Sequence, residues 1–180
     1  MRKMKILLNS RRNVDFSNYT SKVALDALYK KDRKLYNKVL YGLATSDDMV
    51  DVICVFLAPE IPDEIFDTLL DRYVYNSDTY ISNVLINIAK YKKTPPEILD
   101  DLAHDERFGF SAPVTIADNP NTSSETLDYL ATNESSMVRY AVAYNNNTTQ
   151  ETLHVLLNDP DASTRMAAEW VLSHKFGEKF

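Results

Sequence analysis

Two neighbouring segments of the chain have almost the same pattern, and this internal repeat constrains the fold more than any other feature. The segments are ADNPNTSSETLDYL at 117–130 and AYNNNTTQETLHVL at 143–156, and 26 residues separate matched positions such as Asn119 and Asn145. The matched positions recur upstream with a step of 28 residues, and a more divergent copy of the repeat, IPDEIFDTLL, begins at Ile61. A period of this size is typical of solenoids, in which each unit must stack on its neighbours to bury its apolar face.

Each copy of the repeat contains the signals of two short helices. A threonine is followed three residues later by a glutamate, the spacing of a capping box, at Thr94 and Glu97, Thr122 and Glu125, and Thr148 and Glu151. We therefore expect one helix to begin at each threonine. The leucines at 99 and 102, 127 and 130, and 153 and 156 lie three residues apart, so we expect them to form one buried apolar face of these helices. The other half of each copy carries an apolar stripe, which is Val84, Ile88 and Ala89 in the first copy. This stripe predicts a second helix of about two turns.

The composition also favours helices joined by short turns. The 180 residues include only three glycines, which sheets and barrels normally use for bulges and hairpins. Before the repeats, the sequence predicts helices at 20–29, 34–44, 46–57 and 62–72. We therefore predict an all-α fold.

The pattern V-R-x-x-V-A-x-N-x-x-T-x-x-E-x-L-x-x-L is clearest in SMVRYAVAYNNNTTQETLHVLLNDPD at 136–161, with fainter copies before it and a truncated one, STRMAAEWVL, from Ser163. It resembles the leucine-rich repeat variant, which belongs to the wider HEAT and armadillo-like group of helical repeats. The resemblance covers roughly half of the chain, from about 84 to 172. It implies a HEAT-like solenoid, a right-handed α-α superhelix of short helix pairs, and it implies a binding scaffold as the function.

We predict one elongated domain over residues 1–180. Its parts are a basic N-terminal arm or short strand at 1–18, a degenerate and irregular helical cap at 19–78, and helical repeats of about 26 residues at 79–175. No apolar segment approaches the roughly 20 residues that cross a bilayer. The opening MRKMKILLN has too short an apolar run for a signal peptide. We therefore expect a cytoplasmic protein that does not bind membranes.

Matched positions of the copies form columns when the copies are aligned. Columns with the same residue in each copy maintain the fold, so an exposed column whose residues differ is free to contact a partner. One such column holds Lys90, Asp118, Tyr144 and Trp170. Its last two members are of the residue types that most often anchor protein interfaces. Further candidates are Tyr80, Tyr91 and Tyr129. The structural alternative is that Trp170 covers the exposed end of the repeat stack.

Two arginines recur with the same step as the repeat. Arg139 and Arg165 lie 26 residues apart. We expect them to join neighbouring copies by pairing with acids such as Asp159 or Glu134, rather than to bind a substrate.

The charge is divided unequally along the chain. Residues 1–43 contain eleven Lys or Arg and three Asp or Glu, a net charge of +8, whereas residues 44–180 carry −14. The candidate basic patch comprises Arg2, Lys3, Lys5, Arg11, Arg12, Lys30, Lys31, Arg33 and Lys34. Clustered cations of this kind can bind nucleic acid or an acidic protein, and the structural alternative is a solvated helix face. Opposite charge at the two ends also permits head-to-tail self-association.

The sequence lacks the signatures of an enzyme. His104, His154 and His174 fall in unrelated columns without a His-x-x-x-His spacing, and no phosphate-binding glycine loop or nucleophile elbow occurs. The single cysteine, Cys54, lies in the apolar run VICVFLA and is expected to be a buried hydrophobic residue. We therefore predict no catalytic residues, no metal and no cofactor.

Our leading hypothesis is a non-catalytic scaffold or adaptor that binds another protein through the variable face of the repeats. Nucleic-acid binding through the basic segment is an alternative from another functional class. An acidic protein that inhibits or mimics another molecule is a third.

Overall fold

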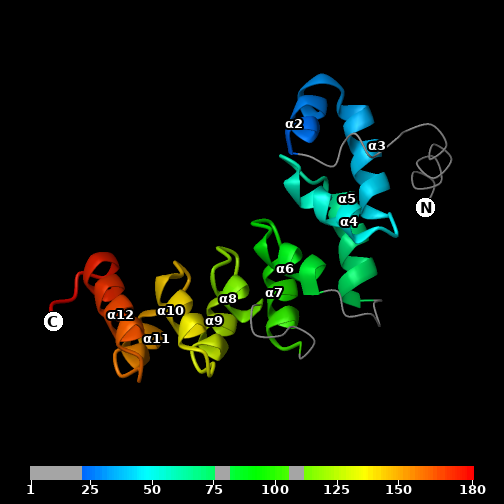
Figure 1. Cartoon of the computed structure of the whole chain (residues 1–180). Coiled ribbons are helices and arrows are strands. Elements are labelled where there is room, and N and C mark those ends of the chain that lie inside the picture. The colour runs from blue at the N-terminus through cyan, green and yellow to red at the C-terminus, as the bar shows by residue number, and fades with distance from the viewer. Residues whose placement is uncertain (1–21, 76–81, 106–111) are drawn as a thin grey trace. The chain divides into compact units, whose positions relative to one another are not determined.

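Short helices joined by turns form the part of the chain that the computed structural model describes (Figure 1). The described residues are 22–75, 82–105 and 112–180. They contain no strand, so the all-α fold class is confirmed for them. Contacts divide the chain into two compact units, with the boundary between Asn87 and Ile88. The predicted arm or strand at 1–18 lies outside the described residues, and the single domain stays a prediction.

The helices of the first unit agree with the sequence prediction to within a few residues. They are α2 (Lys22–Lys31), α3 (Arg33–Ala44), α4 (Met49–Cys54) and α5 (Asp63–Leu70), with a 3₁₀ turn at Val55–Leu57 and a π turn at Asp71–Tyr75. Helix α6 (Ser82–Lys90) contains the boundary between the units. Carboxylates start two of these helices, because Asp32 accepts hydrogen bonds from backbone N–H groups of α3 and Asp48 accepts one from Val50.

Helix α3 provides much of the core of the first unit. Its fully buried side chains are Tyr36, Val39, Leu40, Leu43 and Ala44. The Tyr36 hydroxyl donates a hydrogen bond to the backbone carbonyl of Glu60, which ties α3 to the loop before α5. Burial is the main cause that raises the pKa of Tyr36 to about 12.

The second unit contains two alternating sets of helices. They are α7 (Pro96–Ala103), α8 (Ala112–Ala117), α9 (Ser124–Leu130), α10 (Ser136–Tyr144), α11 (Gln150–Leu156) and α12 (Ala162–Lys175). Helix α10 packs against both α8 and α12, and α7 packs against α9 (Figure 1). The leucines predicted to form one apolar face are buried at Leu99, Leu102, Leu127, Leu130, Leu153 and Leu156. The stripes on α8 and α10 are buried as well, at Ala112, Ile116, Ala117, Val138, Val142 and Ala143.

Two buried asparagines make the same contacts 26 residues apart. Asn119 Nδ2 donates to the carbonyl oxygens of Ala89 and Tyr91, at 2.6 and 3.0 Å. Asn145 Nδ2 donates to those of Ala117 and Asn119, at 2.6 and 2.9 Å. Each side chain therefore supplies one donor to a carbonyl at the helix end, that of Ala89 or Ala117, where intrahelical partners are missing. Its second donor goes to the turn carbonyl of Tyr91 or Asn119, which also accepts from the N–H of Thr94 or Thr122.

The helices after the predicted threonine caps begin one residue later than expected. Their N-caps are Pro95, Ser123 and Thr149. Ser123 Oγ accepts a hydrogen bond from the N–H of Thr126 at 3.1 Å, and Thr149 does the same for Thr152. The predicted capping boxes at the threonines are therefore wrong.

The threonines themselves have another role. Thr94, Thr122 and Thr148 are buried, and each hydroxyl donates to the carbonyl six residues earlier, on Ile88, Ile116 and Val142. A buried hydroxyl needs a partner, and the last carbonyls of a helix need donors. Each threonine therefore completes the end of the preceding helix, and the next residue starts the following one.

Candidate partner-binding face

Aromatic rings form a row on the exposed side of α10 and α12. Tyr140 and Tyr144 of α10 have ring centroids 5.0 Å apart, and Trp170 of α12 lies 5.9 Å from Tyr144. His174 continues the row, stacked on Trp170 at 4.2 Å. The Trp170 side chain remains 51% exposed. A hydrogen bond with Tyr140 is the main cause that raises the pKa of Tyr144.

Two methionines extend this surface. Met137 lies one turn before Tyr140 and is 68% exposed, and Met166 lies one turn before Trp170 and is 69% exposed. Flexible, polarisable methionine side chains are common on surfaces that bind other proteins. We call the surface formed by Met137, Tyr140, Tyr144, Met166 and Trp170 the aromatic face.

Helical spacing explains why these side chains share one surface. Met137, Tyr140 and Tyr144 are three and four residues apart in α10, so they lie along one side of that helix. The opposite side of α10 holds the buried residues Val138 and Val142. Because α10 packs against α12, the second helix presents Trp170 beside Tyr144.

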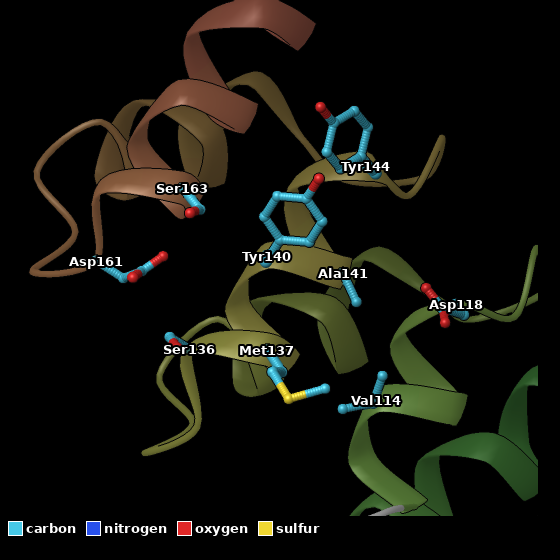
Figure 2. Close-up of a pocket in the computed structure, with 9 residues that line it drawn as sticks. All are labelled: Val114, Asp118, Ser136, Met137, Tyr140, Ala141, Tyr144, Asp161 and Ser163. Atoms are coloured by element: carbon cyan, nitrogen blue, oxygen red, sulfur yellow. The ribbon is translucent and has the colours of Figure 1, made fainter.

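An open pocket of about 540 Å³ lies along the aromatic face. It is lined by Val114, Asp118, Ser136, Met137, Tyr140, Ala141, Tyr144, Asp161 and Ser163, which belong to α8, α10, α12 and the turns beside them. Figure 2 shows Asp118 on the α8 side, Asp161 and Ser163 on the α12 side, and the two tyrosines of α10 between them. The pocket thus combines apolar and aromatic walls with two carboxylates.

The two carboxylates of the pocket differ in their surroundings. Asp161 is the N-cap of α12 and accepts a hydrogen bond from the N–H of Thr164 at 2.9 Å. Asp118 follows α8, and no residue that the structure describes donates a hydrogen bond or forms an ion pair with its carboxylate. Partial burial raises the pKa of Asp118, because desolvation disfavours the charged form.

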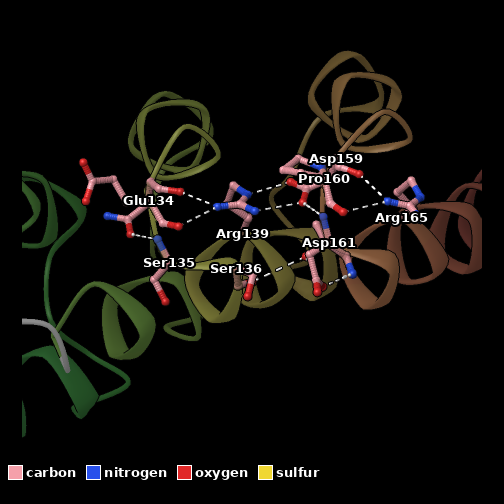
Figure 3. Close-up of polar contacts among 10 residues, drawn as sticks. Glu134, Ser135, Ser136, Arg139, Asp159, Pro160, Asp161 and Arg165 are labelled. Atoms are coloured by element: carbon pink, nitrogen blue, oxygen red, sulfur yellow. Dashed lines mark hydrogen bonds and ion pairs between the residues drawn. The ribbon is translucent and has the colours of Figure 1, made fainter.

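A buried ion pair holds the turns beside the aromatic face (Figure 3). Arg139 Nε and Nη2 donate to the two carboxylate oxygens of Asp159 at 2.6 and 2.9 Å. Arg139 Nη1 donates to the carbonyl oxygens of Asn133 and Glu134. The side chains of Arg139 and Asp159 are only 11% and 3% exposed, and the hydrogen bonds from Arg139 lower the pKa of Asp159. This bidentate geometry fixes the start of α10 relative to the turn before α12.

The predicted role of Arg139 is confirmed, with one difference of detail. It pairs with the carboxylate of Asp159, but it binds Glu134 through the backbone carbonyl. Arg165 does not form the predicted ion pair with an acid among the described residues, because its Nη1 donates to the backbone carbonyls of Asp159 and Pro160 (Figure 3). Carbonyl groups of a turn are invisible in a sequence pattern, which shows only side chains.

The structure brings some of the predicted partner-binding residues together and separates others. Asp118 and Tyr144 line the same pocket, and Trp170 contacts Tyr144. Trp170 therefore contacts the preceding helix pair while it stays half-exposed. Lys90 is exposed at the end of α6, and Tyr129 lies on α9, where its ring stacks on His104 at 4.1 Å. Of the further candidates, Tyr80 lies outside the described residues.

The predicted basic patch is only partly described. Lys30, Lys31, Arg33 and Lys34 are exposed around the turn between α2 and α3. Arg33 is not an isolated cation, because it forms an ion pair with Glu60 at 2.9 Å and lies 3.8 Å above the ring of Tyr29. Five members, Arg2, Lys3, Lys5, Arg11 and Arg12, lie outside the described residues.

Four residues of the aromatic face or of the pocket beside it were not predicted. Val114, Tyr140 and Met166 are spaced by 26 residues, and they form a second column beside that of Asp118, Tyr144 and Trp170. Met137 was missed as well. The signal was present, because large apolar side chains occupy positions outside the buried stripe of each helix.

Metal binding and membrane insertion find no support in the described residues. No cluster of three or more His, Cys, Asp or Glu side chains within them could hold a metal ion. None of the described helices has the length and apolar character that crossing a bilayer requires. Cys54 is buried, as predicted, and burial raises the pKa of its thiol. Comparison of the chain with protein-family models, curated proteins and solved structures finds no match.

Proposed function

We propose that this protein is a non-catalytic scaffold that binds a partner protein through the aromatic face. In this proposal the second unit is a HEAT-like solenoid related to the leucine-rich repeat variant, a right-handed superhelix of short helix pairs. The recurrence of the Asn119 contacts at Asn145, and of the Thr122 contact at Thr148, supports this interpretation of the second unit. In repeat proteins each unit contacts its neighbours, and the stack presents a continuous surface for binding.

The observation that carries the functional proposal is the exposure of the aromatic face. Aromatic and methionine side chains at interfaces supply large contact areas, and Trp and Tyr are among the residues that contribute most binding energy. A contiguous patch of such side chains on a surface marks an interaction site more often than scattered single residues do. The folded core explains none of these five side chains, because other residues of α10 and α12, among them Val138 and Val142 on α10 and Ala168 and Leu172 on α12, face the core.

The test compares three versions of the full chain as baits for affinity capture, followed by mass spectrometry. Replacing Tyr144 and Trp170 together by alanine should release the bound partner, since each anchor of this kind contributes about 2 kcal/mol, or roughly 30-fold in affinity. Tyr129→Ala is the matched control, because Tyr129 is an equally exposed tyrosine at 48% that lies on α9, away from the aromatic face. Circular dichroism checks that all three remain folded.

Two outcomes separate the proposal from its competitors. Proteins captured by the wild type and by Tyr129→Ala, and lost from the double variant, would support the aromatic face as the binding surface. An unchanged set of captured proteins for the double variant would remove the aromatic face from the proposal.

The nucleic-acid alternative has one observation in its favour, the exposure of Lys30, Lys31 and Lys34 on the first unit. The pairing of Arg33 with Glu60 weakens it by neutralising one cation of the patch. Filter binding at increasing salt tests it directly, because binding through phosphate contacts falls steeply with ionic strength. Absence of any salt-dependent retention would eliminate this alternative.

A further inference from the structure

We infer that the partner segment bound by the aromatic face carries a lysine or arginine next to apolar side chains, and that Asp118 receives this cation. This inference rests on the proposed function and adds the chemistry of the partner. It follows from three observations on the pocket: its charged groups are all carboxylates, the Asp118 carboxylate has no partner among the described residues, and aromatic rings lie beside it.

The charged groups of the pocket have one sign. Its lining contains two carboxylates, those of Asp118 and Asp161, and no lysine, arginine or histidine. The apolar part of the lining includes Met137 and Ala141, whose helix α10 comes between the two carboxylates in the order of helices, and Val114, which lies on α8 one turn before Asp118. A complementary ligand therefore carries apolar groups and positive charge. A phosphate backbone would be repelled by the same carboxylates.

Asp118 has no structural role that would account for its charge. The nearby Asp159 pairs with Arg139, and Asp161 caps α12, so both carboxylates stabilise the fold. The Asp118 carboxylate has no such partner among the described residues, although burial already raises its pKa. The equivalent positions on the next helix pairs hold Tyr144 and Trp170, so the stacking of the helices does not require an acid there. Asp118 is exposed, so its carboxylate is accessible to a cation from a partner.

Aromatic rings beside a carboxylate favour the same ligand. Tyr144 lines the pocket together with Asp118, and Trp170 lies 5.9 Å from Tyr144. Tyrosine and tryptophan rings attract lysine and arginine through their electron-rich faces, and the aliphatic stem of the cation packs on the same surface. Asp118 would then bind the charged head while the rings and methionines bind the stem and its apolar neighbours.

The probe for this inference is a phage-displayed library of random peptides, selected on the full-length protein. Selection against the variant with Tyr144 and Trp170 replaced by alanine removes peptides that bind elsewhere. The inference expects the remaining peptides to share a lysine or arginine flanked by apolar residues. Each selected peptide is then measured by titration calorimetry, beside a version in which citrulline replaces arginine or norleucine replaces lysine.

The matched protein variants are Asp118→Asn and Asp101→Asn, since Asp101 is an exposed acid of α7 outside the pocket. Asp118→Asn should weaken the cationic peptide about five- to tenfold and leave the neutral version unchanged. Asp101→Asn should change neither. Reversal of the pair, with Asp118→Lys and a glutamate in the peptide, should restore part of the affinity.

The possible failures are distinguishable. Peptides that need Tyr144 and Trp170 but lack a common cation, or that bind equally well to Asp118→Asn, would overturn this inference and leave the proposed function standing. A selection without any peptide that depends on the two aromatic residues would overturn both. A dimer in sedimentation velocity that is lost in the aromatic double variant would assign the face to a second copy of the chain, and it would also overturn the inference.

Discussion

Replacement of Asn145 tests the contacts that recur between helix pairs of the second unit. This side chain is 7% exposed, and it makes three hydrogen bonds. Nδ2 donates to the carbonyls of Ala117 and Asn119, and Oδ1 accepts from the N–H of Asn147 at 2.9 Å. Asn145→Ala removes all three without creating a steric conflict.

The expected loss of stability depends on whether each hydrogen-bond partner of Asn145 still has a partner in the Asn145→Ala variant. The Asn119 carbonyl still accepts from the N–H of Thr122, and the exposed Asn147 can be hydrated. The carbonyl of Ala117, a buried residue, loses its donor from Asn145. Two hydrogen bonds from Nδ2 contribute about 1 kcal/mol each, and an unsatisfied buried carbonyl adds about 1 kcal/mol more. We therefore expect Asn145→Ala to lower the free energy of unfolding by about 3 kcal/mol.

Asn145→Asp keeps the shape but replaces the donor by a carboxylate that faces two carbonyl oxygens. It should destabilise the protein at least as much as Asn145→Ala at neutral pH. The raised pKa of the new carboxyl means that the folded state binds its proton more tightly than the unfolded state does. The destabilisation should therefore decrease as the pH falls through the folded pKa, and it should level off below about 4, the pKa of the unfolded carboxyl, where both states become protonated.

The assay is urea unfolding followed by circular dichroism, with hydrogen exchange and mass spectrometry to locate the change. Asn146→Ala and Asn146→Asp are the controls, because Asn146 is the exposed neighbour of Asn145 in the same turn. The reasoning is refuted if Asn145→Ala and Asn146→Ala have the same midpoint, or if exchange accelerates no more at 117–147 than in the first unit.

Two further predictions concern buried polar groups. Asp159→Asn should lower the free energy of unfolding by about 3 kcal/mol at pH 7, because it leaves the guanidinium of Arg139 without its buried counterion. The pKa of Asp159 is lowered in the folded protein, so the ionised carboxylate stabilises the fold fully above a pH of about 4. This stabilisation is lost as the pH falls through the folded pKa of Asp159. The urea midpoints of the variant and the wild type should therefore converge in acid. Tyr36→Phe should lower the free energy of unfolding by about 1 to 2 kcal/mol through loss of the hydrogen bond to Glu60. Because burial raises the pKa of Tyr36 to about 12, the free energy of unfolding of the wild type should fall as the pH rises above about 10. The Tyr36→Phe variant should lack this part of the alkaline loss of stability, which would assign it to Tyr36.

Much of the local structure of this protein was determined by its sequence alone. Apolar spacing and the scarcity of glycine predicted helices, and the leucines at matched positions are buried as predicted. The pairing of Arg139 with Asp159 also followed from the repeat, because a shared period places the two residues at neighbouring turns. These features depend on periodicity along the chain, which a sequence displays directly.

Tertiary structure decided which of two adjacent polar residues starts each helix. Thr122 and Ser123 are both capable N-caps, and local preference does not separate them. The choice depends on the turn between α8 and α9, which buries Thr122 and places its hydroxyl on the carbonyl of Ile116. The predicted cap was wrong for this reason.

The aromatic face was likewise settled by packing. The sequence identified Asp118, Tyr144 and Trp170 as one column, but it grouped them with Tyr129, which stacks on His104 on another helix. It did not identify Tyr140, Met137 or Met166 as members of the same surface. A repeat pattern shows which positions are equivalent, whereas the helix packing determines which of these positions remain exposed and adjacent, because burial is a property of neighbours that are distant in the chain.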